Sequence, residues 1–92
     1  MMNLSEEQIK EIEMMAELFF SPEDIALNVE VDSAMLRIEF HVVESEACKA
    51  YMRGWLRGEI SLRKGIAQAA ANGSNPAQQM MREFQQQNKI NV

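Results

Sequence analysis

The sequence predicts an all-α protein of about five helices, in which an N-terminal helix-turn-helix unit is followed by a long helix and a C-terminal helix that form a hairpin. Apolar residues recur at three- and four-residue steps, which is the spacing of one helix face. Capping residues, prolines and glycines stand where these periodic segments begin and end. A chain of 92 residues is enough for one domain. We expect residues 1–43 to form the helix-turn-helix part and residues 44–92 the hairpin, used for oligomerisation or partner binding.

Each helix start carries a recognisable signal. Ser5 and Gln8 have the spacing of a capping box, and Ser21-Pro22 is a strong start because serine caps and proline suits the first helical position. Asp32 and Asn75 are the predicted caps of the third and last helices, and Asn72-Gly73 ends the long one. Valines make strands conceivable near residues 27–31 and 38–43, but the flanking caps favour helices. The predicted helices are a first one from Ser5, then 22–29, 33–40, 44 or 45 to 71, and 76–87.

The charges are distributed unevenly along the chain. The net charge is −5, yet residues 1–46 carry 12 acids and 2 bases, whereas residues 47–92 carry 2 acids and 7 bases. This asymmetry indicates an acidic face that meets a basic face of another copy, or a basic stripe that meets phosphate. No apolar run approaches the roughly 18 residues of a membrane span. A single cysteine, Cys48, fits a reducing compartment, and we expect a bacterial cytoplasmic protein with Cys48 buried and inert.

The sequence gives little support to an enzyme. His41 is the only histidine, so a catalytic triad or metal cluster built on it lacks partners. No phosphate-binding loop or dinucleotide-type glycine fingerprint occurs. We therefore predict a protein with no catalytic residues, no metal and no cofactor.

A helix-turn-helix is the first candidate functional unit, over Pro22 to Phe40. Such a unit needs two short helices that cross closely, with the second helix in the major groove. Apolar or small residues fall at the interior spacing, and Ala26 is the small residue that permits close contact. Ser33 and Met35 are the candidates for base edges and Arg37 for phosphate. The predicted interior positions are Ile25, Ala26, Val29, Val31 and Leu36.

Two positions depart from the usual helix-turn-helix pattern. Glu30 stands where glycine is common in the turn, and Glu39 stands where the second helix usually has an apolar residue. Arg37 is the only base of the segment, whereas phosphate binding depends on lysine and arginine. One copy of this unit is therefore expected to bind DNA poorly. The alternative interpretation is a pair of ordinary packed helices.

The long helix is the second candidate, because its bases fall within an arc of about 120° at 100° per residue. Three interpretations of these bases are open: they bind phosphate, they contact the acidic half of a neighbouring copy, or they form a solvated face. The opposite side is predicted to be a core stripe, interrupted by Glu59. Gly54, Gly58 and Gly65 weaken the helix and mark a kink or the close approach of a neighbouring helix. The bases are Lys49, Arg53, Arg57, Arg63 and Lys64. The core stripe comprises Cys48, Tyr51, Met52, Trp55, Leu62, Ile66, Ala69 and Ala70, and the predicted interface anchors are Tyr51, Trp55, Met80, Met81 and Phe84.

The order of several segments resembles a known family. LSEEQI at residues 4–9 precedes FSPEDIA at 20–26, AYMRG at 50–54, LRKGI at 62–66 and ANGSNPAQ at 71–78. In this order they resemble small phage and prophage proteins of the terminase small-subunit family. The resemblance covers roughly residues 4–84, and its strongest part is the basic helix followed by Asn-Gly-Ser and Asn-Pro-Ala-Gln.

The resemblance implies a role in packaging viral DNA. Members of that family bind double-stranded DNA, assemble into homo-oligomeric rings and deliver DNA to a separate large terminase subunit, which holds the ATPase and nuclease. By this analogy, residues 22–40 would read DNA and residues 44–87 would build the oligomer or contact the large subunit. The alternatives from the residues alone are a helical adaptor that contacts only protein and a helix-turn-helix transcriptional regulator.

Overall fold

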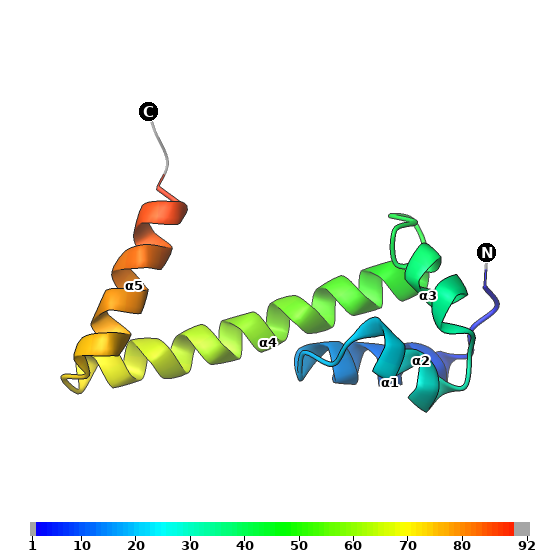
Figure 1. Cartoon of the computed structure of the whole chain (residues 1–92), viewed down its shortest axis with the longest axis horizontal. Coiled ribbons are helices and arrows are strands. Elements are labelled where there is room, and N and C mark those ends of the chain that lie inside the picture. Colours follow the sequence, from blue (N-terminus) through cyan, green and yellow to red (C-terminus); the bar gives the residue numbers. More distant parts are fainter. Residues whose placement is uncertain (1, 90–92) are drawn as a thin grey trace. The chain divides into compact units, whose positions relative to one another are not determined.

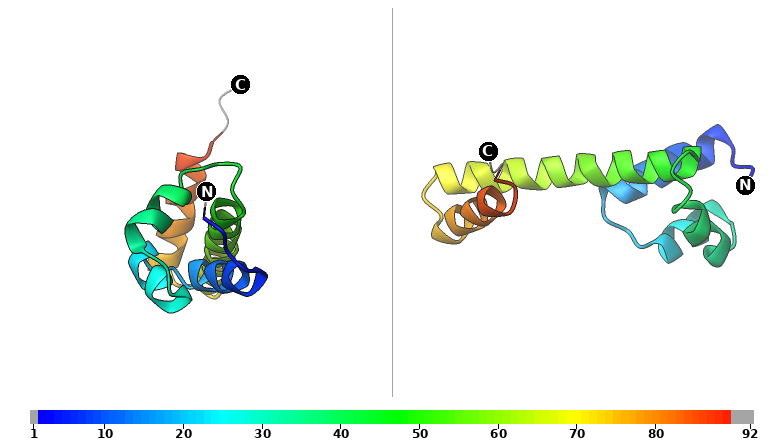
Figure 2. Two further views of the ribbon diagram at one scale, coloured as in Figure 1. Left: turned by 90° about the vertical axis from the view of Figure 1, so that its right-hand side faces the viewer. Right: turned by 90° about the horizontal axis from the view of Figure 1, so that it is seen from above.

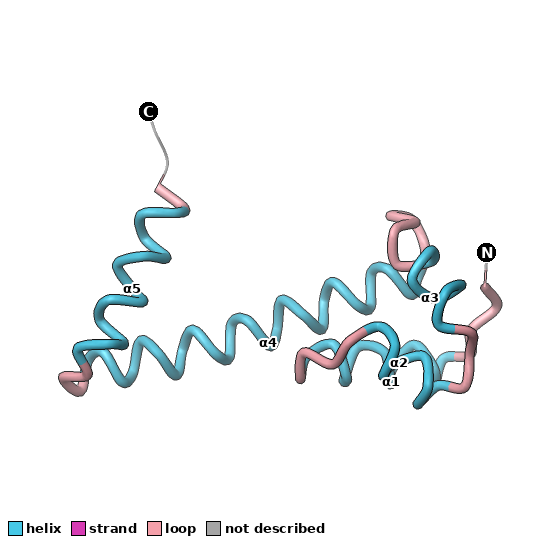
Figure 3. Tube along the Cα trace, viewed as in Figure 1, coloured by secondary structure: helices cyan, strands magenta, loops and turns pink. Residues whose placement is uncertain are grey.

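The computed structural model describes residues 2–89, and the regular structure of this range is entirely helical (Figure 1). The prediction of an all-α fold is confirmed. Short turns connect the helices (Figure 3), and neither 27–31 nor 38–43 forms a strand. The helices are α1 (Glu6–Glu17), α2 (Pro22–Val29), α3 (Ser33–Glu39), α4 (Glu46–Ala71) and α5 (Asn75–Gln87).

Local hydrogen bonds fix the starts of the first three helices. The Ser5 hydroxyl accepts from the Gln8 N–H at 3.1 Å, and the Gln8 side chain accepts from the Ser5 N–H at 2.8 Å. This reciprocal pair is the predicted capping box, which satisfies two amide groups that a helix end leaves without partners. Ser21 and Asp32 cap α2 and α3 through their side-chain oxygens.

The chain divides into two compact units, residues 1–59 and 60–92, and the division falls inside α4. The first unit has an apolar core to which α1, α2, α3 and the start of α4 all contribute. Ile12, Ile25 and Leu36 are its largest fully buried apolar side chains. The other buried members are Met15, Ala26, Val29, Ala47 and Ala50.

Glycines of α4 lie directly against α1. A Cβ atom added to Gly54 would lie 2.1 Å from the Glu13 carbonyl oxygen, and one added to Gly58 would lie 2.2 Å from that of Glu17. The contact advances by four residues on both helices, so α1 and the first half of α4 run parallel, as the views of Figure 2 show. Only glycine lets two backbones approach so closely. We call this contact of Gly54 and Gly58 with Glu13 and Glu17 the α1–α4 seam. Both glycines therefore mark a close helix contact, and α4 continues without a break at either position.

The predicted core stripe of α4 is wrong for Met52, Trp55 and Leu62. Met52 is 62% exposed and Trp55 43% exposed, and Leu62 is exposed as well. The buried face consists of Ala47, Cys48, Ala50, Gly54 and Gly58, of which Cys48 alone belongs to the predicted stripe. Small residues take the inner face because α1 approaches too closely for large side chains, which are left on the outer surface.

The second unit pairs the end of α4 with α5. Gly73 has φ 99°, the left-handed conformation expected where a helix ends in glycine. The cap of α5 is Ser74, whose hydroxyl accepts from the Ala77 N–H at 3.3 Å. The predicted cap, Asn75, is instead the first helical residue. Gln78 donates to the Ala70 carbonyl at 3.1 Å, which fastens α5 to the end of α4.

Glu30 has φ 62° and ψ 48° at the end of α2, and a residue with a Cβ atom is strained there. Glu30→Gly is therefore expected to raise the free energy of unfolding by about 1 kcal/mol, measured by urea denaturation. Glu11→Gly is the matched control, because Glu11 lies in right-handed helix α1, where glycine costs about 1 kcal/mol. Equal destabilisation by both changes would contradict the strain.

Candidate nucleic-acid interface

The α2–turn–α3 segment has the packing that a helix-turn-helix requires. Ala26 is buried at the helix contact, and its carbonyl accepts from the Val31 N–H at 3.0 Å. The left-handed Glu30 reverses the chain in the position usually taken by glycine. The predicted interior residues Ile25, Val29 and Leu36 are buried and Val31 packs partly against them. Acidic Glu30 therefore does not prevent the turn from forming.

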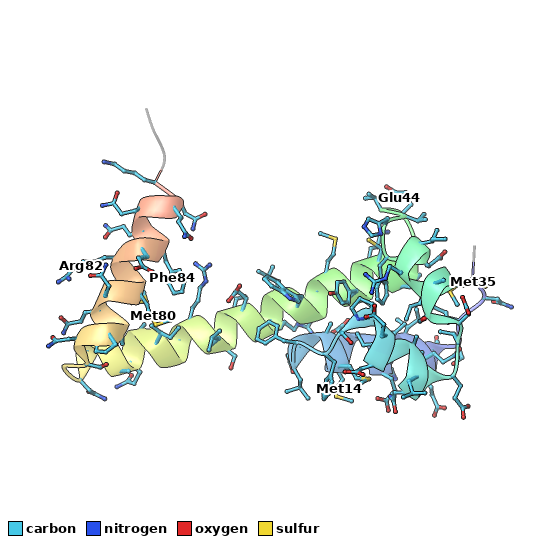
Figure 4. The ribbon with its side chains drawn as sticks, in the orientation of Figure 1. Met14, Met35, Glu44, Met80, Arg82 and Phe84 are labelled. Atoms are coloured by element: carbon cyan, nitrogen blue, oxygen red, sulfur yellow. The ribbon has the colours of Figure 1, made fainter. Side chains whose placement is uncertain are left out.

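The outer side of α3 carries the residues proposed to read DNA. Ser33, Met35 and Arg37 are all exposed, and Figure 4 shows Met35 on the outer side of the helix. Sequence analysis missed Ile38, which is also exposed and adds an apolar side chain to this surface. Its spacing of three from Met35 could have indicated this, because such residues share a helix face.

Arg37 forms an ion pair with Glu23 of α2. Both side chains are about half exposed, so the guanidinium is solvated as well as paired. An exposed ion pair of this kind contributes little to stability and is easily exchanged for another partner. Arg37 therefore lies at the helix-turn-helix surface and has a carboxylate of its own chain beside it.

Glu39 replaces an apolar residue of the usual pattern and is nevertheless 6% exposed. Its Oε1 accepts from the Met2 N–H at 3.4 Å, while the Ser45 hydroxyl donates to its backbone carbonyl at 3.1 Å. A buried carboxylate needs such donors to offset the loss of water. The segment before α1 thus supplies a donor to the Glu39 carboxylate, whereas the turn before α4 binds the Glu39 backbone.

Two bases of the predicted stripe meet one carboxylate of α1. Arg53 Nε donates to Glu13 Oε1 at 2.9 Å, and Arg57 Nη1 donates to Glu13 Oε2 at 2.5 Å. Glu13 is 23% exposed, whereas the arginine side chains are 49% and 59% exposed. Sequence analysis did not identify Glu13, because a pairing across 40 residues follows only from the α1–α4 seam.

The second unit holds the other two predicted phosphate ligands. The Arg63 guanidinium lies 3.9 Å from the centroid of the Phe84 ring, a cation–π contact that joins α4 to α5. Lys64 is exposed. Arg63 thus packs against Phe84 as well as carrying charge, and Lys64 is the more accessible of the two predicted ligands.

The predicted interface anchors divide between the two units. In the second unit Phe84 and Met81 are half-buried and Met80 is exposed; Figure 4 shows Phe84 on the side of α5 that faces α4 and Arg82 on the other side. In the first unit Tyr51 stacks on Phe40 at 4.4 Å between centroids.

Trp55 belongs to an open apolar groove of the first unit. Its ring contacts Phe19 edge-on at 5.5 Å between centroids, which leaves its outer side exposed. Exposed apolar patches of this kind are typical of surfaces that bind another protein. The lining comprises Val43, Glu44, Lys49, Tyr51, Met52, Arg53, Trp55 and Leu56.

Residues 2–89 contain no cluster of histidine, cysteine or carboxylate side chains that could hold a metal ion. His41 is exposed and its Nδ1 lies 2.8 Å from the Arg37 carbonyl. None of the helices formed by these residues has the length and apolarity needed to cross a membrane. Comparison with known proteins gave no match to a family model, to a curated protein or to a solved structure.

Proposed function

We propose that this chain is a non-catalytic DNA-binding protein that acts as a homo-oligomer and places α3 in the major groove. The observation that carries the proposal is the α2–turn–α3 packing, with left-handed Glu30 between two short capped helices. Ser33 and Met35 stand at the N-terminal end of α3, from which recognition helices contact base edges. Arg37 lies one turn further, where it would contact phosphate.

Oligomerisation is part of the proposal because one copy has unfavourable electrostatics. Residues 1–59 carry 13 acidic and 5 basic side chains, a net charge of −8. A DNA duplex repels such a unit unless its few exposed bases act together. Repeated copies on one DNA molecule multiply weak phosphate contacts without any new type of contact. The exposed apolar groove at Tyr51 and Trp55 supplies a surface on which copies could assemble.

The resemblance to terminase small subunits gives this binding a biological setting. We propose that the oligomer recognises viral DNA during packaging in a bacterial cell and supports a large terminase subunit. The large subunit would supply ATP hydrolysis and DNA cleavage. The exposed bases Arg53, Arg57 and Lys64, together with half-buried Arg63, would add phosphate contacts outside the helix-turn-helix.

A salt titration of binding to duplex DNA tests the proposal. The logarithm of the affinity should fall linearly with the logarithm of salt concentration, and Arg37→Gln should lower this slope by about 1 per bound chain. Ser33→Ala and Met35→Ala should change the preference among DNA sequences and leave the slope unchanged, since base contacts release no counterions. Absence of binding by the assembled oligomer at low salt would refute DNA binding.

A protein-binding adaptor is the second candidate, favoured by the apolar groove and by the pairing of three predicted DNA-binding arginines with carboxylates. In this case the acidic half of one copy meets the basic half of another. Trp55→Ser should then abolish the assembly, and no variant should bind DNA.

A dimeric transcriptional regulator would use the same α3 surface. Analytical ultracentrifugation that finds a dimer on DNA would favour this regulator over a larger oligomer.

A further inference from the structure

The most unusual charge arrangement in the first unit is a single carboxylate shared by two arginines. Each oxygen of Glu13 accepts from a different guanidinium, at 2.9 Å from Arg53 and 2.5 Å from Arg57. Two positive charges therefore face one negative charge. The arginines remain about half exposed, so solvent and other anions reach their outer sides.

The α1–α4 seam determines this geometry. Gly54 lies against the Glu13 carbonyl, which brings the Glu13 side chain between the arginine that precedes Gly54 and the one that follows it by three residues. Arg53 and Arg57 are four residues apart and share one face of α4. The pair of guanidinium groups is therefore held ready in one place.

A phosphodiester group matches the acceptor that Glu13 now provides. Like a carboxylate, it carries one negative charge and offers two oxygen atoms for charge-assisted hydrogen bonds from arginine. A pocket of about 290 Å³ adjoins the site and brings a further base, Lys10, and a further acid, Glu17, to the same surface. A phosphate that displaces Glu13 would still find an excess of positive charge there.

We propose that Glu13 acts as an internal competitor for DNA phosphate at Arg53 and Arg57, and so limits the affinity of the chain for DNA. This inference rests on the proposed DNA-binding function and adds its regulation. Glu13 restrains both arginines in the absence of DNA and gives them up when a phosphate arrives. Binding is thereby weakened in each copy, and several copies must act together on one DNA molecule.

Glu13→Gln tests the inference, because a neutral amide has one acceptor oxygen and lacks the negative charge that strengthens both hydrogen bonds. Affinity for a labelled DNA duplex should rise by up to roughly 5-fold for each arginine released, which is the contribution of one exposed ion pair. The salt slope should stay that of the wild type, because the same phosphates are contacted in both chains. Glu7→Gln is the matched control, since it removes the same charge from an exposed position in the first turn of the same helix. Circular dichroism establishes that both variants retain the helical fold.

The outcomes separate the inference from the function on which it rests. If the wild-type chain binds DNA and the two glutamine variants bind it with equal affinity, Glu13 does not compete with phosphate and the inference is overturned. If neither the wild type nor Glu13→Gln binds DNA at low salt, the proposed DNA-binding function is refuted, and the inference that rests on it is refuted as well. Introducing Arg57→Gln into the Glu13→Gln chain should remove part of the gain, because one of the released arginines is then absent.

Discussion

Gly54→Ala is expected to lower the free energy of unfolding by about 2 kcal/mol, and the melting temperature by roughly 8–16 °C. The new methyl group would lie 2.1 Å from the Glu13 carbonyl oxygen and 3.0 Å from the Ala16 Cβ. Backbone cannot rotate away as a flexible side chain does, so α1 must shift. Alanine favours helix by about 1 kcal/mol over glycine, and the clash must exceed this gain. Thermal denaturation followed by circular dichroism measures the outcome.

Two other glycines of α4 provide the controls. Gly65 has no atom within 4 Å of an added Cβ, so Gly65→Ala should stabilise its helix by roughly 0.5–1 kcal/mol. Gly58→Ala should behave like Gly54→Ala, because its Cβ would lie 2.2 Å from the Glu17 carbonyl. Equal melting temperatures for the wild type and Gly54→Ala would show that α1 does not pack on α4 as described.

Replacing both Arg53 and Arg57 with glutamine is expected to weaken DNA binding about 30-fold per bound chain near 0.15 M salt. This factor assumes that two phosphate contacts are lost and that each contributes about 0.9 to the salt slope. It also takes the contribution of these contacts to affinity as zero near about 1 M salt. The slope should correspondingly fall by about 2. Glutamine is preferable to glutamate, because a new acid would repel Glu13 and destabilise the fold. A loss of DNA affinity could then not be separated from a loss of folded protein. Fluorescence anisotropy across a range of salt concentrations measures both quantities.

The matched control for the double variant removes two bases from another place. Arg82→Gln with Lys89→Gln changes the net charge by the same amount, but both residues are exposed at or beyond α5 and neither is a proposed DNA ligand. If this control weakens binding as much as the α4 variant, general charge explains the affinity. If the α4 variant alone has no effect, Arg53 and Arg57 do not contact DNA.

Helix boundaries could be predicted from the sequence because they depend on neighbouring residues. The cap at Ser21 and the proline beside it fix the start of α2, and its predicted range agrees with the structure. The same local rule misplaced the last cap by one residue, since Ser74 and Asn75 are both good capping residues. Sequence spacing cannot choose between two adjacent caps.

The inner face of α4 could not be predicted from residue size. Large apolar residues usually form the buried side of a helix, and this rule selected Met52 and Trp55. The structure buries Gly54 and Gly58 instead, because α1 makes backbone contact there. Likewise, the bases of α4 could be placed on one face, but their partner Glu13 depends on how two distant helices align.

The α1–α4 seam also has a consequence for the order in which the first unit folds. Its contacts join residues about forty positions apart, whereas α2 and α3 meet across a short turn. Closing such a long loop costs more chain entropy than forming a turn. We therefore expect the α2–α3 pair to form early and the seam to close last, with α1 entering the native core only after α4 has formed its glycine-lined face.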